Sequence, residues 1–224
     1  MPVNIIILMP TFLYLAFETI ALLILIIQYK KLEKSVYIYF LPYLLFIVIY
    51  ECASVFNLFN IHGSNAYITN IVITIEFAFY SFFLISLISR KLKRLLTALV
   101  ILCLLFTVVD VFFIQGFWNL CTIAILVQYV MLIVLVCCFF YQLMNSSGQS
   151  MSLLSLPHFW VNTGLLFFCL AEFLFFAAFA YMASRNNYHY YLLSLVIANM
   201  ANLILYSCLS ISFLCFSKTK KLSH

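Results

Sequence analysis

Residues 4–28 read NIIILMPTFLYLAFETIALLILIIQ, and this stretch decides the fold. Its segment 21–27 is apolar on every face, whereas a strand of a transmembrane β-barrel would alternate apolar and polar side chains. A helix needs about 20 apolar residues to cross the hydrocarbon of a bilayer. The stretch lacks the basic leading region of a signal peptide, carries Glu18 midway and is followed by Lys30 and Lys31. We therefore expect a membrane-spanning helix here.

The same pattern recurs along the rest of the chain. The 224 residues are 67% hydrophobic and only 8% charged, which is too little polar surface for a soluble domain, so lipid must cover the outside. We predict an all-α fold with one seven-helix transmembrane domain over residues 1–216 and a short basic cytoplasmic tail over 217–224. The predicted spans are 4–28, 36–59, 66–89, 95–115, 118–143, 158–183 and 189–216.

Basic residues mark one side of the membrane. Of the eleven, all but Arg185 follow the first or third predicted span or lie in the tail. Because basic loops stay in the cytoplasm, we expect the N-terminus outside, the C-terminus inside, and a multi-pass protein of the bacterial inner membrane. These clusters can attract anionic head groups, but they are short turns, and we expect no nucleic-acid binding. They comprise Lys30, Lys31, Lys34, Arg90, Lys91, Lys93, Arg94, Lys218, Lys220 and Lys221.

Five of the six acidic residues lie inside the predicted spans. A carboxylate at the centre of a bilayer costs at least about 2.5 kcal/mol, so it must face protein, water or a cation. Counting about 1.5 Å per residue from the outer boundary places Glu51, Glu76 and Glu172 roughly 12–16 Å deep, and Glu18 somewhat deeper. These four carboxyls can share one layer, whereas Asp110 lies toward the outer end of its span.

The seventh span carries polar groups at a comparable depth. Asn199 and Asn202 form an i, i+3 pair, and Tyr206 lies one turn further along the same face. No Lys or Arg lies at that depth, so we expect the carboxyls to be protonated, hydrogen-bonded, or paired with a bound cation. The alternative is that these groups only join helices, at about 0.6 kcal/mol per hydrogen bond. The predicted ligand site, in the outer half of the bundle, is Glu18, Glu51, Glu76, Glu172, Asn199, Asn202 and Tyr206.

Other chemistries lack their residues. A retinal protein needs a lysine in its last span, and residues 189–216 contain none. The four histidines fall at boundaries, in loops or in the tail, no C-x-x-C pair occurs among the eight cysteines, and neither G-x-S-x-G nor H-E-x-x-H is present. We therefore expect no metal, no cofactor, no disulfide framework and no enzymatic activity. Transport is also disfavoured, because glycines and prolines that would break helices are few.

Three segments carry a resemblance. Residues 157–168, PHFWVNTGLLFF, residues 65–83, and the N-x-x-N-x-x-x-Y pattern of residues 199–206 resemble small bacterial seven-span membrane proteins and the membrane regions of some histidine kinases. The resemblance implies a sensory or signalling module but assigns no residue roles. For Trp160 and Gly164 we favour an interface anchor and a helix contact. The matching positions are Glu76, Phe159, Trp160, Asn162, Gly164, Asn199, Asn202 and Tyr206.

The expected function is a membrane sensory module. A small or lipidic ligand, or a proton, would occupy the polar site and shift the packing of the helices. Only residues 217–224 follow the last predicted span, so we expect the signal to pass through the loops 30–35, 90–94 and 145–155 to a separate membrane or cytoplasmic partner protein. The main alternative is a structural subunit of a larger membrane assembly, and a small transporter or intramembrane enzyme is less favoured.

Overall fold

The computed structural model describes residues 3–32, 35–61, 63–145, 153–185 and 188–219. Seven helices within these ranges are long and apolar enough to cross a membrane, and the described residues form no strand, only an isolated bridge between Ile61 and Ser64. The predicted all-α, seven-helix fold is thereby confirmed. The helices are α1 (Val3–Leu32), α2 (Phe40–Val55), α3 (Ala66–Leu87), α4 (Arg90–Val109), α5 (Thr122–Asn145), α6 (Pro157–Arg185) and α7 (Tyr188–Thr219).

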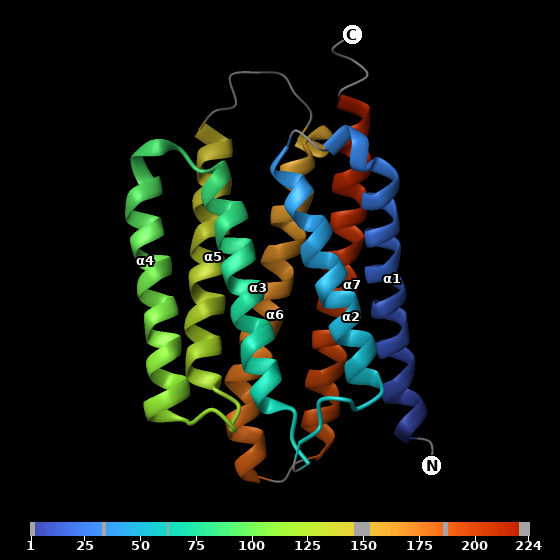
Figure 1. The fold of residues 1–224 in the computed structure, drawn as a ribbon, viewed down its shortest axis with the longest axis vertical. Helices are drawn as coiled ribbons and strands as arrows, with labels where there is room; N and C mark the ends of the chain where they lie inside the picture. Colours follow the sequence, from blue (N-terminus) through green and yellow to red (C-terminus); the bar gives the residue numbers. More distant parts are fainter. Residues whose placement is uncertain (1–2, 33–34, 62, 146–152, 186–187, 220–224) are drawn as a thin grey trace.

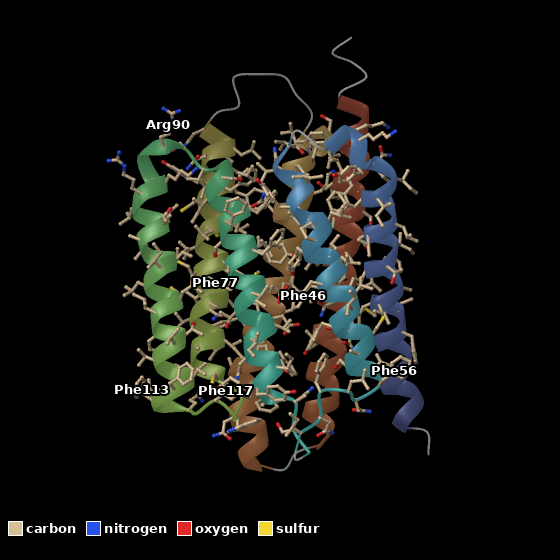
Figure 2. The ribbon with its side chains drawn as sticks, viewed as in Figure 1. Phe46, Phe56, Phe77, Arg90, Phe113 and Phe117 are labelled. Atoms are coloured by element: carbon tan, nitrogen blue, oxygen red, sulfur yellow. The ribbon has the colours of Figure 1, made fainter. Side chains whose placement is uncertain are left out.

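The helices run up and down in a bundle, with α2 and α3 drawn in front of α6 and α7 (Figure 1). We call the end at which α1 and α7 finish the basic end, because Lys30, Lys31 and Arg90 lie there. Figure 2 shows Arg90 at the basic end and Phe113 at the opposite end. Short elements extend three of the helices: the 3-10 turns η1 (Val36–Tyr39) and η3 (Leu153–Ser155) precede α2 and α6, and the π-helical turn η2 (Asp110–Ile114) continues α4.

The bundle divides into two groups of helices. Helix α7 packs between α1 and α6, and α2 packs on α1, whereas α3 and α4 pack on α5. Helix α5 joins the groups through α6. The approach of α6 to α7 is close because Gly164 has no side chain: a Cβ there would lie 2.7 Å from the Cβ of Cys208. Gly164 therefore is the helix contact that the sequence indicated.

Helices α2 and α3 meet mainly through aromatic side chains in the half of the bundle nearer the basic end. The rings of Tyr43 and Phe79 stack with centroids 4.0 Å apart, and Phe40 packs edge-on against Phe79 and Phe83. The group extends to α7, because Phe213 also packs on Phe40. We call this group the aromatic cluster; it comprises Tyr37, Phe40, Tyr43, Phe79, Tyr80, Phe83 and Phe213.

Several helix ends differ from the predicted spans. The predicted span 36–59 is four residues too long, because α2 ends at Val55 and the backbone turns at Asn57, where φ is 54°. The basic residues 90–94 were expected in a loop, but they form the first turns of α4. Apolar side chains continue past the true end of α2, and basic ones past the true start of α4, so hydropathy misplaces both boundaries.

Candidate functional site

A partly open cavity of about 160 Å³ lies among α2, α3, α5, α6 and α7, in the half of the bundle away from the basic end. Three carboxyls from three helices line it, together with amide and hydroxyl groups. We call it the carboxylate cavity. Its polar wall residues are Tyr50, Glu51, Thr69, Glu76, Tyr129, Glu172, Asn202 and Tyr206, and none of the residues along its wall is Lys, Arg or His.

The structure brings five of the seven predicted site residues to this wall. Glu51 comes from α2, Glu76 from α3, Glu172 from α6, and both Asn202 and Tyr206 from α7. They converge because each lies on the side of its helix that faces the centre of the bundle. The depth argument from the helical rise thus grouped residues that are neighbours in space, although it could not show which way each side chain points.

Two predicted residues do not line the cavity. Glu18 on α1 is fully buried behind it, close enough to interact electrostatically with Glu51 and Glu76. Neither carboxyl oxygen of Glu18 has a hydrogen-bond partner among the described residues. Asn199 on α7 is half-buried, and its Nδ2 is likewise buried without a partner in the described part of the chain. Neither residue therefore belongs to the cavity wall.

Tyrosine hydroxyls hold two of the three cavity carboxyls. Tyr14 of α1 donates to Glu51 Oε2 at 2.7 Å, and Tyr43 of α2 donates to Glu76 Oε1 at 3.1 Å. Glu172 is only 7% exposed, and no described residue donates a hydrogen bond to its carboxyl. Tyr129 and Tyr206, both largely buried, add two further phenol side chains to the same wall.

The cavity carboxyls surround the space without converging on one point. Within the described residues, no group of three or more His, Cys, Asp or Glu side chains is placed to hold a metal ion. Several separate acceptors around a small volume suit an occupant that donates several hydrogen bonds in different directions. The wall therefore fits a compact cationic or hydrogen-bonding molecule.

Asp110 belongs to a different part of the bundle. It is fully buried in η2, and its Oδ2 accepts a hydrogen bond of 3.1 Å from the backbone N–H of Ala124, in the first turn of α5. A carboxyl at this position satisfies an unpaired N–H and complements the positive end of the helix dipole. Asp110 is thus a structural cap for α5 and takes no part in the carboxylate cavity.

Sequence reasoning missed the polar groups that join α3, α4 and α5. The Asn70 amide donates to Asn119 O at 2.7 Å and accepts from Cys121 N at 3.0 Å, which fixes the loop before α5 to α3. Gln128 on α5 donates to the Thr107 hydroxyl at 2.8 Å. Buried amides in otherwise apolar spans were the available signal. These residues join helices to one another, which is the role that the alternative interpretation gave to the buried acids.

The cavity also contains residues that the sequence did not single out. Tyr50, Thr69 and Tyr129 line it, and Tyr43 holds Glu76 from the side. The hydrogen bond between Tyr43 and Glu76 leaves no motif in the sequence, because the two residues lie on different helices. Tyr14 of α1 likewise contributes from another helix, through its hydrogen bond to Glu51.

The residues of the segment 157–168 occupy the basic end of α6. The Trp160 indole donates to Leu154 O at 2.8 Å, and the Asn162 amide donates to His158 O at 2.7 Å. No protein-family model matches the chain, and no curated protein or solved structure matches it either. The functional argument therefore depends on the geometry of the carboxylate cavity.

Proposed function

We propose that this protein is a membrane sensory module that binds a compact cationic ligand in the carboxylate cavity and passes the resulting change in helix packing to a separate partner protein. One observation carries the proposal: Glu51, Glu76 and Glu172 come from three helices to the wall of one cavity, and no residue along that wall is Lys, Arg or His. A carboxylate inside a membrane costs at least about 2.5 kcal/mol unless it is paired. A ligand that pairs with them recovers that cost.

The size of the cavity limits the part of the ligand that it can hold. An engineered protein cavity of about 150 Å³ accommodates benzene, so a cavity of about 160 Å³ holds a group of roughly six non-hydrogen atoms. Three glutamates without a basic residue on the wall favour a positive charge in that group. A small organic cation meets both conditions.

Tyr43 supports a route from the ligand to the basic end. It donates to Glu76 on the cavity and stacks on Phe79 in the aromatic cluster. A ligand that draws the Glu76 carboxyl toward itself would weaken the bond to Tyr43 and favour a second packing of the two rings. Such a two-state contact is what a binding site needs to bias a distant surface.

We place the basic end in the cytoplasm and the chain in the bacterial inner membrane. Lys30, Lys31 and Arg90 lie at that end, and basic loops are retained on the cytoplasmic side. The carboxylate cavity then lies in the outer half of the membrane. Alkaline phosphatase fused after Asn60 should be active and fused after Ser89 inactive, and the reverse pattern would invert the orientation.

Ligand binding can be tested with butylamine, whose cation matches the cavity in size. In lipid nanodiscs, butylamine should raise the thermal unfolding temperature of the wild type, whereas butan-1-ol should not. Glu172→Gln should reduce the apparent affinity for butylamine at least about tenfold, because one carboxylate of the binding group is lost. The matched control is Glu33→Gln, which changes the one acidic residue outside the predicted spans. This substitution should leave the affinity for butylamine unchanged.

Signal transmission needs a separate readout. Hydrogen–deuterium exchange should change on butylamine binding in the segments 35–39 and 87–90 at the basic end. A protein that butylamine stabilises without any change in these segments would have a binding site but no sensory coupling. Absence of stabilisation by butylamine in the wild type would remove the binding proposal itself.

A further inference from the structure

A second hollow adjoins the carboxylate cavity on the lipid-facing side of α2 and α3. It has a volume of about 490 Å³, roughly three times that of the cavity. Its lining is aromatic and aliphatic, and several of its side chains are about 40–50% exposed on the surface that lipid covers; Phe46, one of them, is labelled in Figure 2. We call this hollow the lateral groove, and its lining includes Pro42, Tyr43, Phe46, Ile75, Phe79 and Phe82.

The groove and the cavity follow the same seam between α2 and α3. Along α3, Phe82 and Phe79 line the groove, and Glu76 one turn further on lines the cavity. Tyr43 forms the partition: its ring lines the groove and its hydroxyl donates to Glu76 Oε1 at 3.1 Å. The backbones of α2 and α3 do not pack closely here, so movement of the Tyr43 and Phe79 side chains would join the two hollows.

We propose that the ligand is a membrane-borne primary amine whose ammonium group binds in the carboxylate cavity and whose alkyl chain lies in the lateral groove. This inference rests on the function proposed above and names the class of its ligand. The amine reaches the cavity sideways from the bilayer, between Tyr43 and Phe79. Its chain replaces ordinary lipid along the groove.

The chemistry of the wall selects the ammonium group. A primary ammonium is a compact point charge with three donors and no acceptor. Glu51 and Glu76 already accept from tyrosine hydroxyls, which leaves the unpartnered Glu172 as the main carboxylate for the charge. The apolar groove on the other side of Tyr43 accounts for the chain, because Tyr43 lines the groove and donates to Glu76 on the cavity wall.

A photoreactive ligand tests this arrangement. The probe is decylamine with a diazirine at the end of its chain, used on the wild-type protein in nanodiscs and mapped by mass spectrometry. We expect labelling of peptides that contain Phe46, Ile75 and Phe82, and loss of that labelling when excess butylamine occupies the cavity. Decanol with the same diazirine should label the groove no more than the lipid-facing residues Leu102 and Leu105 of α4.

A groove-filling variant provides the second arm. Ile75→Trp should lower the apparent affinity for decylamine at least about tenfold while leaving that for butylamine unchanged, and Leu102→Trp on α4 should change neither. Equal labelling by decylamine of the groove and of α4, unaffected by butylamine, would overturn the lateral-groove inference. In that case, stabilisation by butylamine would still stand, whereas the lack of any response to either amine would overturn the proposed function too.

Discussion

The aromatic cluster and the carboxylate cavity lie along the same seam between α2 and α3, yet they are built in different ways. In the cluster, Tyr37, Phe40 and Phe83 are fully packed, with ring centroids 5–6 Å apart, which is the favourable range for aromatic pairs. In the cavity, Glu51, Glu76 and Glu172 from three helices line one volume, and its wall carries no basic residue. The first region holds the fold together, and the second retains a cost that a ligand can offset.

The largest expected effect is on the aromatic cluster. Phe40→Ala should destabilise the protein by about 3 kcal/mol, because it leaves a void where six rings meet. The midpoint of SDS-induced unfolding measures this change. Phe113→Ala is the matched control, since Phe113 is 82% exposed on the lipid-facing surface, and its effect should stay within about 0.5 kcal/mol. Equal effects of the two substitutions would show that the aromatic cluster does not contribute specially to the stability of the fold.

Substitution of Glu18, behind the cavity, should increase the free energy of unfolding rather than lower it. Glu18→Met replaces a fully buried carboxyl that has no partner among the described residues with an apolar side chain of similar length. We expect a gain of about 1–3 kcal/mol in unfolding free energy, because the desolvation cost of the carboxyl disappears. A loss of stability in the same SDS titration would show that the Glu18 carboxyl stabilises the fold.

Asp110 separates a structural acid from the cavity acids. Asp110→Ala should cost about 1 kcal/mol, because the first turn of α5 loses the acceptor for Ala124 N–H. Butylamine affinity should not change, since Asp110 does not line the cavity. Measuring unfolding and binding on the same sample makes the distinction, and weakened binding with unchanged stability would reverse the assignment.

The smallest effect on stability is expected at Tyr43, which belongs to the aromatic cluster and donates to Glu76 on the cavity wall. Tyr43→Phe removes one hydrogen bond to Glu76, worth about 0.6 kcal/mol in a membrane protein, and keeps the stacked ring. Butylamine should still stabilise this variant. Its effect on hydrogen–deuterium exchange at segments 35–39 and 87–90 should disappear, and a preserved effect would show that coupling follows another path.

Much of the architecture was predictable because it depends on local properties of the chain. Apolar runs longer than the bilayer is thick must be helices, since no other open backbone satisfies its hydrogen bonds in lipid. The regular rise of those helices also grouped Glu51, Glu76 and Glu172 at one depth before any contact was known. The end of α2 was misplaced because apolar Phe56, Leu58 and Phe59 follow its last residue, Val55, on both sides of the turn at Asn57.

The sequence by itself therefore determined that this is a seven-helix membrane protein with acids buried in its spans. Only the tertiary structure decided that Glu172 faces a cavity, that Glu18 lies behind it, and that Asp110 caps α5. The reason is physical: depth follows from counting residues along one helix, whereas the direction of a side chain depends on how that helix is rotated against its neighbours. That rotation is set by the packing of the whole bundle at once, including the close approach at Gly164.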